Sequence, residues 1–97
     1  MLTVVETPDF QKQAAKFWTD DMRMAFISWI AQNPQAGDVI PGADGARKVR
    51  WAMQGRGKSG GVRVVYFNLS ASGFVLLFAI YAKAVRANMS AKEIKAV

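Results

Sequence analysis

Two consecutive stretches in the second half of the chain are apolar at nearly every position and rich in β-branched and aromatic residues. They span 62–68 and 74–83, and the short segment between them contains Ser70, Ser72 and Gly73. β-branched and aromatic residues favour strands, whereas the serines and the glycine of the short segment favour a turn. A strand that is apolar on both faces belongs in the middle of a sheet that is at least partly covered on each side. The sequence therefore predicts two adjacent strands at the centre of a sheet.

Two helices are predicted in the first part of the chain. Thr7 is a residue type that caps helices, and Pro8 suits the first helical position, where a backbone N–H would have no helical partner. A second helix should begin near Thr19 or Asp20 and end at Asn33, because the proline that follows disfavours helical geometry at that residue. Apolar and aromatic side chains recur at helical spacing in both segments, which indicates core packing rather than a ligand site.

The remaining segments complete an α+β element order. Residues 2–6 are a short strand candidate, and residues 35–45 form a loop marked by Gly37, Pro41, Gly42 and Gly45. Residues 46–52 alternate in a way that places positive charge on both faces of a strand or at its edge. Residues 90–93 read Ser-Ala-Lys-Glu, a capping-box pattern that starts a short terminal helix. We therefore expect a single domain over residues 1–97 with the order β-α-α-β-β-β-α.

The octet AMQGRGKS at residues 52–59 matches a relaxed form of the phosphate-binding loop of nucleotide-binding proteins. That pattern needs a helix directly after it, because the helix N-terminus supplies the amides that hold the phosphates. Here Gly60 and Gly61 follow, and then β-type sequence, so a helix is not expected. We interpret the octet as a glycine-rich connection between strands, in which Arg56 and Lys58 meet an anion.

Cysteine and histidine are absent from the sequence, and this limits the metal sites and the catalytic groups that the protein can have. Without cysteine there is neither a disulfide framework nor a thiolate metal site, and without histidine there is no imidazole for metal binding or acid–base catalysis. We expect no metal and no cofactor. The longest apolar run, residues 74–80, is far shorter than the ~20 residues that span a bilayer. Acidic residues also interrupt the region where a signal peptide would be apolar, so we expect a cytoplasmic protein with no membrane partner.

Charge is distributed unevenly along the chain, and this is more informative than the net charge of +6. Residues 1–45 carry three Lys or Arg against six Asp or Glu, a net charge of −3. Residues 46–97 carry ten Lys or Arg against one acidic residue, a net charge of +9. Such a basic half indicates a polyanionic partner, nucleic acid being the commonest, although a solvated surface kept for solubility gives the same pattern.

Four stretches together resemble one known family. They are NPQAGDVIPG at 33–42, GARKVRWA at 45–52, GRGKSGGVRVVY at 55–66 and YAK at 81–83. On these stretches the sequence resembles the HigB branch of the RelE-like toxins of bacterial toxin–antitoxin systems, over nearly the whole chain. The resemblance implies the RelE/ParE-like toxin fold, a small antiparallel sheet with a helical hairpin on one face. It also implies a cognate antitoxin with a helix-turn-helix DNA-binding part, similar to HigA.

The same resemblance implies an activity, a ribosome-dependent endoribonuclease that cuts messenger RNA and so inhibits translation. In such enzymes the ribose 2′-hydroxyl attacks its own 3′-phosphate and leaves a 2′,3′-cyclic phosphate. By motif position Arg63 matches the arginine that contacts the scissile phosphate, and Lys83 matches a second catalytic residue on the last strand. The residues that match a basic loop and a basic strand for RNA or ribosome binding are Arg47, Lys48, Arg50, Arg56 and Lys58.

The chemistry of these side chains fits that reaction independently. A guanidinium group offers fixed, paired donors for the charge that gathers on a pentacoordinate phosphate. A lysine among several cations in a partly desolvated cleft should have a lowered pKa, so Lys83 is our candidate for proton transfer. Some relatives use a histidine near the C-terminus, and this chain has none, which leaves the proton carriers open. The structural alternatives are that Arg63 pairs with Glu6 or Asp44 and that Lys83 extends from a strand end into solvent.

Two other functions remain compatible with the sequence. The ParE-like toxins share the fold and inhibit DNA gyrase by binding, without catalysis. A simple RNA-binding module would need only the basic surface. Tyr66 and Tyr81 are candidates for stacking on a base, although tyrosines in such strands are more often core residues.

Overall fold

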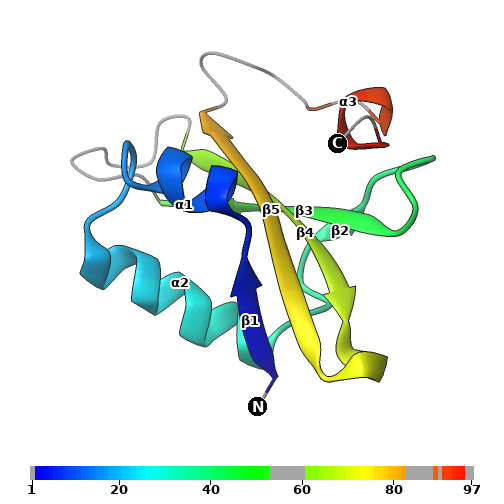
Figure 1. Ribbon diagram of the computed structural model, residues 1–97, viewed down its shortest axis with the longest axis horizontal. Helices are drawn as coiled ribbons and strands as arrows, with labels where there is room; N and C mark the ends of the chain where they lie inside the picture. The colour runs from blue at the N-terminus through cyan, green and yellow to red at the C-terminus, as the bar shows by residue number, and fades with distance from the viewer. Residues whose placement is uncertain (1, 53–60, 83–88, 90, 96–97) are drawn as a thin grey trace.

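Strands β4 (Val62–Leu69) and β5 (Phe74–Ala82) lie in the interior of a five-stranded sheet, as their apolar character predicts. The sheet has the strand order β1-β5-β4-β3-β2 (Figure 1). A short 3-10 turn, η1 (Ser70–Ser72), joins the two central strands, and Gly73 ends it with a φ of 89°, a conformation that favours glycine. The computed structural model describes residues 2–52, 61–82, 89 and 91–95.

The neighbouring strands extend the sheet on either side. β3 (Ala46–Trp51) pairs antiparallel with β4, whereas β1 (Thr3–Glu6) pairs in parallel with β5. The sheet is therefore mixed: the expected antiparallel pairing holds from β2 to β5, and β1 is the exception. Two helices carry the chain across one face after β1, so no hairpin turn fixes the direction of this strand.

A fifth strand, β2 (Asp38–Val39), lies within the segment that the sequence predicts as a loop. It pairs antiparallel with β3, Asp38 opposite Lys48 and Val39 opposite Arg47. A strand of two residues leaves no periodic pattern in a sequence, which is why it was not predicted. The rest of the predicted element order is observed.

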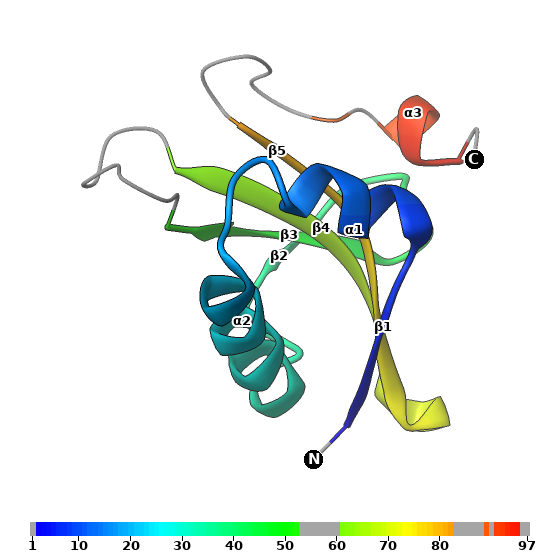
Figure 2. The same cartoon turned by 60° about the vertical axis from the view of Figure 1, so that its left-hand side comes forward.

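Helices α1 (Pro8–Ala14) and α2 (Asp20–Gln32) begin where the sequence predicts. Each follows a threonine, Thr7 or Thr19, whose hydroxyl accepts a hydrogen bond from a backbone N–H of the first turn. α2 ends at the cap residue Asn33, directly before the proline. Figure 2 shows both helices on the same side of the sheet. None of the helices in the described part of the chain is long and apolar enough to cross a membrane.

Apolar side chains pack on both sides of the sheet. α1 and α2 cover one side, here called the helix face, and its core contains Phe10, Ala14, Trp18, Phe26, Ile30, Val62, Val64, Tyr66, Val75, Leu77 and Ile80. The opposite side, here called the open face, has a smaller core of Ala43, Ala46, Val65, Tyr81 and Ile94. Ile94 belongs to the short terminal helix α3 (Ala91–Lys95), which confirms the predicted last element. Because α3 has only five residues, it covers a limited part of the open face.

Candidate nucleic-acid interface

Strand β3 divides its basic residues between the two faces of the sheet. Val49 and Trp51 pack on the core of the helix face, so Arg47, two residues before Val49, lies on that side as well. Lys48 and Arg50 alternate with them and therefore project from the open face. The sequence predicts charge on both faces of this strand or at its edge, and the first of these arrangements is the one observed.

Arg50, Arg63 and Tyr81 occupy directly opposed positions on three neighbouring strands of the open face, here called the transverse row. Arg50 of β3 pairs with Arg63 of β4, and Arg63 pairs with Tyr81 of β5. Side chains at such positions have Cβ atoms about 4.5–5.5 Å apart. Lys48 lies on the same face, two residues before Arg50. The sheet register thus brings together three basic residues, Lys48, Arg50 and Arg63, that the sequence indicates as site residues.

The pairing of Arg50 with Arg63 has an electrostatic consequence. Like charges at directly opposed positions destabilise a sheet unless an acidic group or an anion lies beside them. Arg50 is exposed and Arg63 is partly buried. Guanidinium groups donate paired hydrogen bonds that match the oxygens of a phosphate. The transverse row therefore has the chemistry of a phosphate-binding site.

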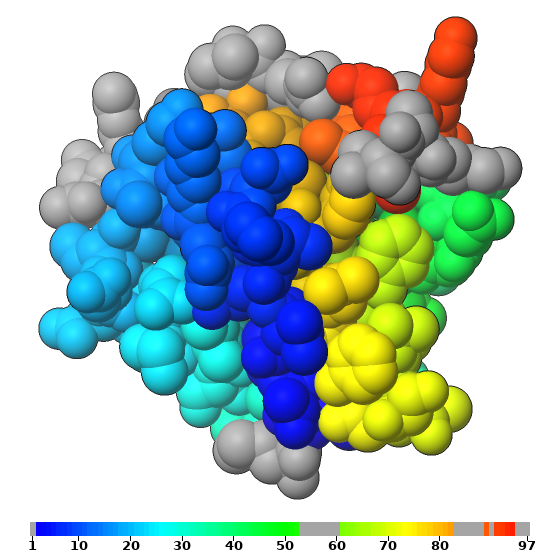
Figure 3. Space-filling view, in the orientation of Figure 1, coloured from blue at the N-terminus to red at the C-terminus, as the bar shows by residue number. Residues whose placement is uncertain are grey.

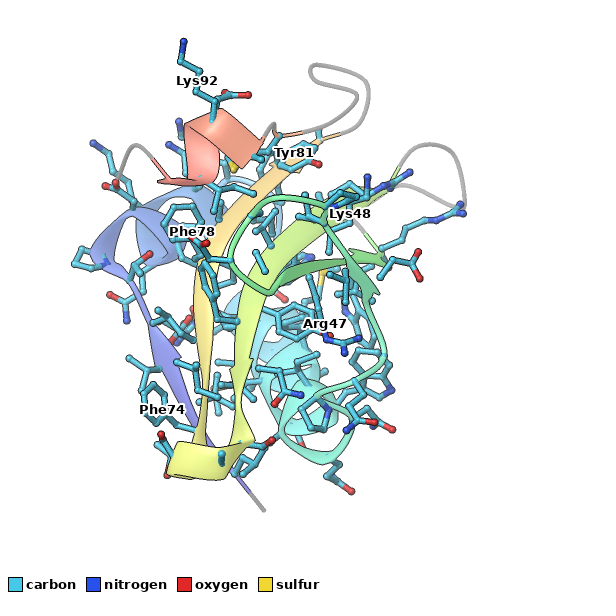
Figure 4. All side chains as sticks on the ribbon, turned by 90° about the vertical axis from the view of Figure 1, so that its right-hand side faces the viewer. Arg47, Lys48, Phe74, Phe78, Tyr81 and Lys92 are labelled. Atoms are coloured by element: carbon cyan, nitrogen blue, oxygen red, sulfur yellow. The ribbon has the colours of Figure 1, made fainter. Side chains whose placement is uncertain are left out.

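Tyr81 ends the transverse row and is largely covered. Its side chain packs in the core of the open face with Ile94 of α3, and the residue is 8% exposed. Its hydroxyl accepts a hydrogen bond of 3.2 Å from the backbone N–H of Met89. Figure 4 shows Tyr81 and Lys48 at the same end of the sheet, next to α3. Tyr81 thus connects the C-terminal residues to the row and offers little ring surface for stacking on a base.

Tyr66 and Arg47 bind the loop that follows α2. The Tyr66 hydroxyl donates to the Pro34 carbonyl at 2.9 Å and accepts from the Gly37 N–H at 2.8 Å. Arg47 Nη1 donates to the carbonyls of Gln35 and Gly37, at 3.3 and 2.7 Å. Burial of the Tyr66 phenol raises its pKa above the ordinary value. Tyr66 is fully buried in the helix-face core and so has no exposed ring for a base, and Arg47 is engaged with the loop.

Glu6, one acidic residue considered as a partner for Arg63, is bound elsewhere. Both of its carboxylate oxygens accept hydrogen bonds from Arg23 Nη1, at 2.6 and 2.7 Å. The hydrogen bond to Glu6 raises the pKa of Arg23 above its ordinary value. This ion pair joins β1 to α2 on the helix face, opposite the face from which Arg63 projects.

Comparison with solved structures places this architecture among known folds, although no protein-family model matches the sequence. The structure superposes on a mutant of the E. coli toxin RelE in the free state, with a TM-score of 0.61 over 89% of this chain and 87% of that chain. The chain has the fold of RelE. The two sequences are 14% identical, so the likeness concerns the fold alone. The expected RelE-like fold is confirmed, and the HigB branch remains a finer assignment that we treat as a proposal.

Several of the predicted site residues lie outside the described part of this RelE-like fold. These are Arg56, Lys58 and Lys83. The element after the glycine-rich octet is nevertheless clear, since β4 begins at Val62. A strand follows the octet, as predicted, and not the helix that a phosphate-binding loop requires. Among the described residues, no group of three His, Cys, Asp or Glu side chains is arranged to hold a metal ion.

A cleft that sequence reasoning did not predict lies at one end of the transverse row. It has a volume of about 530 Å³ and is lined by residues of α1, of the segment that follows it and of the last part of β5. Its described lining includes Asp9, Lys12 and Phe17 on one side, and Phe78 and Tyr81 on the other. The walls come from opposite ends of the chain, so no local pattern in the sequence could have indicated them.

Proposed function

We propose that this protein is the toxin of a type II toxin–antitoxin system and acts as a ribosome-dependent mRNA endoribonuclease of the HigB branch. The observation that carries the proposal is the position of Arg63 beside Arg50 on the open face of a RelE-like fold. A surface kept basic for solubility alone gains nothing from placing two like charges at directly opposed positions. A site for RNA phosphate accounts for this arrangement.

In the proposed reaction the ribose 2′-oxygen forms a bond to the adjacent phosphorus, and the bond from phosphorus to the 5′-oxygen of the next nucleotide breaks. The 2′-hydroxyl gives its proton to a base, and the departing 5′-oxygen receives a proton. The products are a 2′,3′-cyclic phosphate and a 5′-hydroxyl end. We assign Arg63 to the phosphate, because donors held in place before the reaction stabilise the charge that develops in the transition state.

The other groups follow from the same proposal. Lys83, which directly follows the last residue of β5, is assigned to proton transfer, because the chain has no histidine. Lys48 and Arg50, together with Arg56 and Lys58 of the octet, bind phosphates of the message or of ribosomal RNA. The proposed partners are the ribosome, its mRNA and a cognate antitoxin with a helix-turn-helix part. The proposed site of action is the cytoplasm.

The experiment that tests the proposal is cleavage of messenger RNA on translating ribosomes by the purified protein. We expect Arg63→Ala to lower the single-turnover rate about 100-fold, since loss of one such donor costs ~3 kcal/mol. The unfolding free energy of the variant should be close to that of the wild type. Lys16→Ala is the matched control, because Lys16 is an exposed cation in the connection between α1 and α2.

Two results would contradict this assignment. Intact message after incubation with the wild-type protein would overturn the ribonuclease, and inhibition of DNA gyrase by the same preparation would then favour a ParE-like toxin. Binding of RNA without cleavage would favour a simple RNA-binding module. Equal loss of rate in Arg63→Ala and Lys16→Ala would show that only total charge matters.

A further inference from the structure

The hairpin formed by β3 and β4 has little support from other strands at one end. Trp51 and Val62 are the last register partners there, and Ala52 and Gly61 adjoin them in the sequence. We call these four residues the hairpin neck. β2 pairs only with the first part of β3, so among the described residues no strand lies on the outer side of β3 near the neck. Strand ends of this kind are among the first parts of a protein to open.

Trp18 binds the hairpin neck from the helix layer. Its indole Nε1–H donates a hydrogen bond of 2.7 Å to the carbonyl of Ala52. Trp18 is buried in the connection between α1 and α2, which Figures 1 and 2 both show next to the end of β3 and the start of β4. In Figure 3 the atoms of residues 8–32, from blue to cyan, form one continuous surface, so this connection is part of the helix layer. A residue 34 positions away in sequence therefore holds the backbone directly after β3.

Aromatic side chains hold the ring of Trp18 in place. The ring centroids of Phe10 and Phe26 lie 6.3 and 5.2 Å from that of Trp18. Phe26 also contacts Trp51 of the hairpin neck, with centroids 5.1 Å apart in an edge-to-face arrangement. Such pairs stabilise a protein beyond the area that they bury, and their geometry is specific. The position of the indole donor is therefore set by α1, by α2 and by the neck itself.

The other side of the hairpin neck is equally restricted. Gly61 has a φ of 59°, a conformation that favours glycine. A Cβ at this position would lie 2.7 Å from the carbonyl oxygen of Trp51. The two backbones thus meet without room for a side chain, and any larger residue at position 61 would push the neck apart.

The hairpin neck lies directly beside the transverse row. Arg50 precedes it on β3, Arg63 follows it on β4, and the two arginines are register partners. Opening of the neck would loosen this pair first, because it is the next one along the hairpin. Donors that are fixed before binding lose less freedom when a phosphate binds to them. The helix layer thus supports the row from the opposite side of the sheet, through the neck.

We propose that Trp18 is a positioning residue for RNA binding, because by holding the hairpin neck it keeps Arg50 and Arg63 in register for a phosphate. The inference rests on the proposed function in taking RNA as the ligand, but it does not require that the RNA is cleaved. Trp18 carries no charge and acts only through the neck. Loss of its hydrogen bond should therefore weaken RNA binding without changing the number of phosphates that the protein contacts.

The experiment measures binding of a single-stranded RNA oligonucleotide to the full chain by fluorescence anisotropy at several salt concentrations. Trp18→Phe keeps an aromatic ring and removes the donor. We expect it to bind about three- to tenfold more weakly, the effect of one hydrogen bond. The slope of log affinity against log salt should equal that of the wild type, whereas Arg50→Ala should reduce it. Thr7→Ala is the matched control, because it also removes a hydrogen bond from the helix layer to a sheet carbonyl, that of Phe78.

A second pair of variants tests the hairpin neck from its other side. Gly61→Ala should weaken RNA binding at an unchanged salt slope, because the added Cβ displaces the Trp51 carbonyl. Gly73→Ala is its control: Gly73 has a φ of 89° as well, but it ends the η1 turn at the other end of β4, and no atom lies within 4 Å of an added Cβ. Circular dichroism and thermal unfolding establish that each variant is folded at the temperature of the binding measurement.

The outcomes separate this inference from the proposed function. Weaker binding at an unchanged slope in Trp18→Phe and Gly61→Ala, with wild-type affinity in both controls, supports the positioning role whether or not RNA is cleaved. Equal affinity of Trp18→Phe and the wild type would overturn the role, even if the wild type cleaves RNA. An equal loss in Thr7→Ala would overturn it too, since general destabilisation would then be responsible. A slope reduced as in Arg50→Ala would contradict it, because a phosphate contact would be lost outright. Absence of RNA binding by the wild type would overturn both this inference and the proposed function.

Discussion

Tyr66 is completely buried, yet its hydroxyl both donates and accepts a hydrogen bond. Through the Pro34 carbonyl and the Gly37 N–H it holds the loop between α2 and β3 against the sheet. A Cβ at Gly37 would lie 2.7 Å from the Lys48 carbonyl oxygen and 2.9 Å from the Tyr66 hydroxyl, so glycine is required by this close approach. Because Lys48 belongs to β3, these contacts also position the strand that carries the basic residues.

The stability of the protein should depend on this hydroxyl and on pH. Burial raises the pKa of the Tyr66 phenol in the folded protein above its ordinary value of about 10. Below pH ~10 the phenol is protonated in the folded and in the unfolded chain, so its full contribution to the unfolding free energy is present there. As the pH rises further, the phenol of the unfolded chain ionises first, and stability falls. We expect Tyr66→Phe to lower the unfolding free energy by about 1–3 kcal/mol at neutral pH, because two buried loop groups lose their partner.

Urea unfolding of the wild type and of Tyr66→Phe between pH ~8 and ~11 measures both effects. The difference in unfolding free energy between the two proteins should shrink above pH ~10, since only the wild type has this phenol. A difference that stays constant over the whole range would contradict the role given to the raised pKa.

Residue roles could be predicted from the sequence where near neighbours determine them. The caps at Thr7 and Thr19 and the end of α2 at Asn33 are of this kind. The burial of Tyr66 and the hydrogen bonds of Arg47 could not be predicted in this way, because the partners of both side chains belong to a loop distant in sequence. A sequence alone does not distinguish a side chain that binds such a loop from a side chain that binds a ligand.

At the scale of elements, Thr7 links α1 to the sheet. Its hydroxyl accepts from the Phe10 N–H at 3.0 Å and donates to the Phe78 carbonyl at 3.2 Å. Its backbone N–H also donates to the Leu77 carbonyl, where the parallel pairing of β1 with β5 ends. One residue therefore starts the helix and fixes it to the central strand.

Thr7→Ala should lower the unfolding free energy by about 1–3 kcal/mol, the sum expected for a helix cap and one further hydrogen bond. Thr7→Ser keeps the hydroxyl and is the matched control, expected within about 0.5 kcal/mol of the wild type. Chemical denaturation measures both variants. Equal destabilisation by alanine and serine would mean that the methyl group, and not the hydroxyl, is responsible.

The sequence predicts the type of nearly every element because apolar periodicity and capping residues are local properties. The parallel direction of β1 and the two-residue β2 depend on contacts across the sheet, and no local pattern encodes them. The apolar character of β4 and β5 predicts cover on both faces, and α3 supplies only part of it on the open face. The open face is therefore covered less completely than the composition of β4 and β5 predicts.

At the scale of the whole molecule, the basic second half of the sequence is not one surface. Lys48, Arg50 and Arg63 project from the open face, whereas Arg47 lies on the helix face and binds loop carbonyls. Composition predicts the excess of positive charge, but only strand register shows which charges share a face. The basic residues of the candidate site could therefore be predicted from the sequence, but the way in which they are arranged on the sheet could not.

This arrangement predicts how binding of RNA should respond to salt. Each phosphate contact releases counterions, so its loss should reduce the slope of log affinity against log salt by roughly 0.7–1. We expect that reduction for Lys48→Ala and for Arg50→Ala, because both side chains project from the open face. Arg47→Ala removes the same charge from the same strand, but it should leave the slope unchanged. Its effect should instead be a loss of about 1–2 kcal/mol in unfolding free energy, as the Gln35 and Gly37 carbonyls lose a charged donor.

Fluorescence anisotropy with a single-stranded RNA oligonucleotide, at salt concentrations from about 50 to 200 mM, gives the slopes for the three variants. Arg47→Ala is the decisive comparison, because it matches the others in charge and in strand and differs only in face. If it lowered the slope as much as Arg50→Ala, RNA would be responding to the total charge of the chain, and the assignment of binding to the open face would fail. If only the open-face variants lower the slope, the RNA backbone lies along the side of the sheet that carries the transverse row.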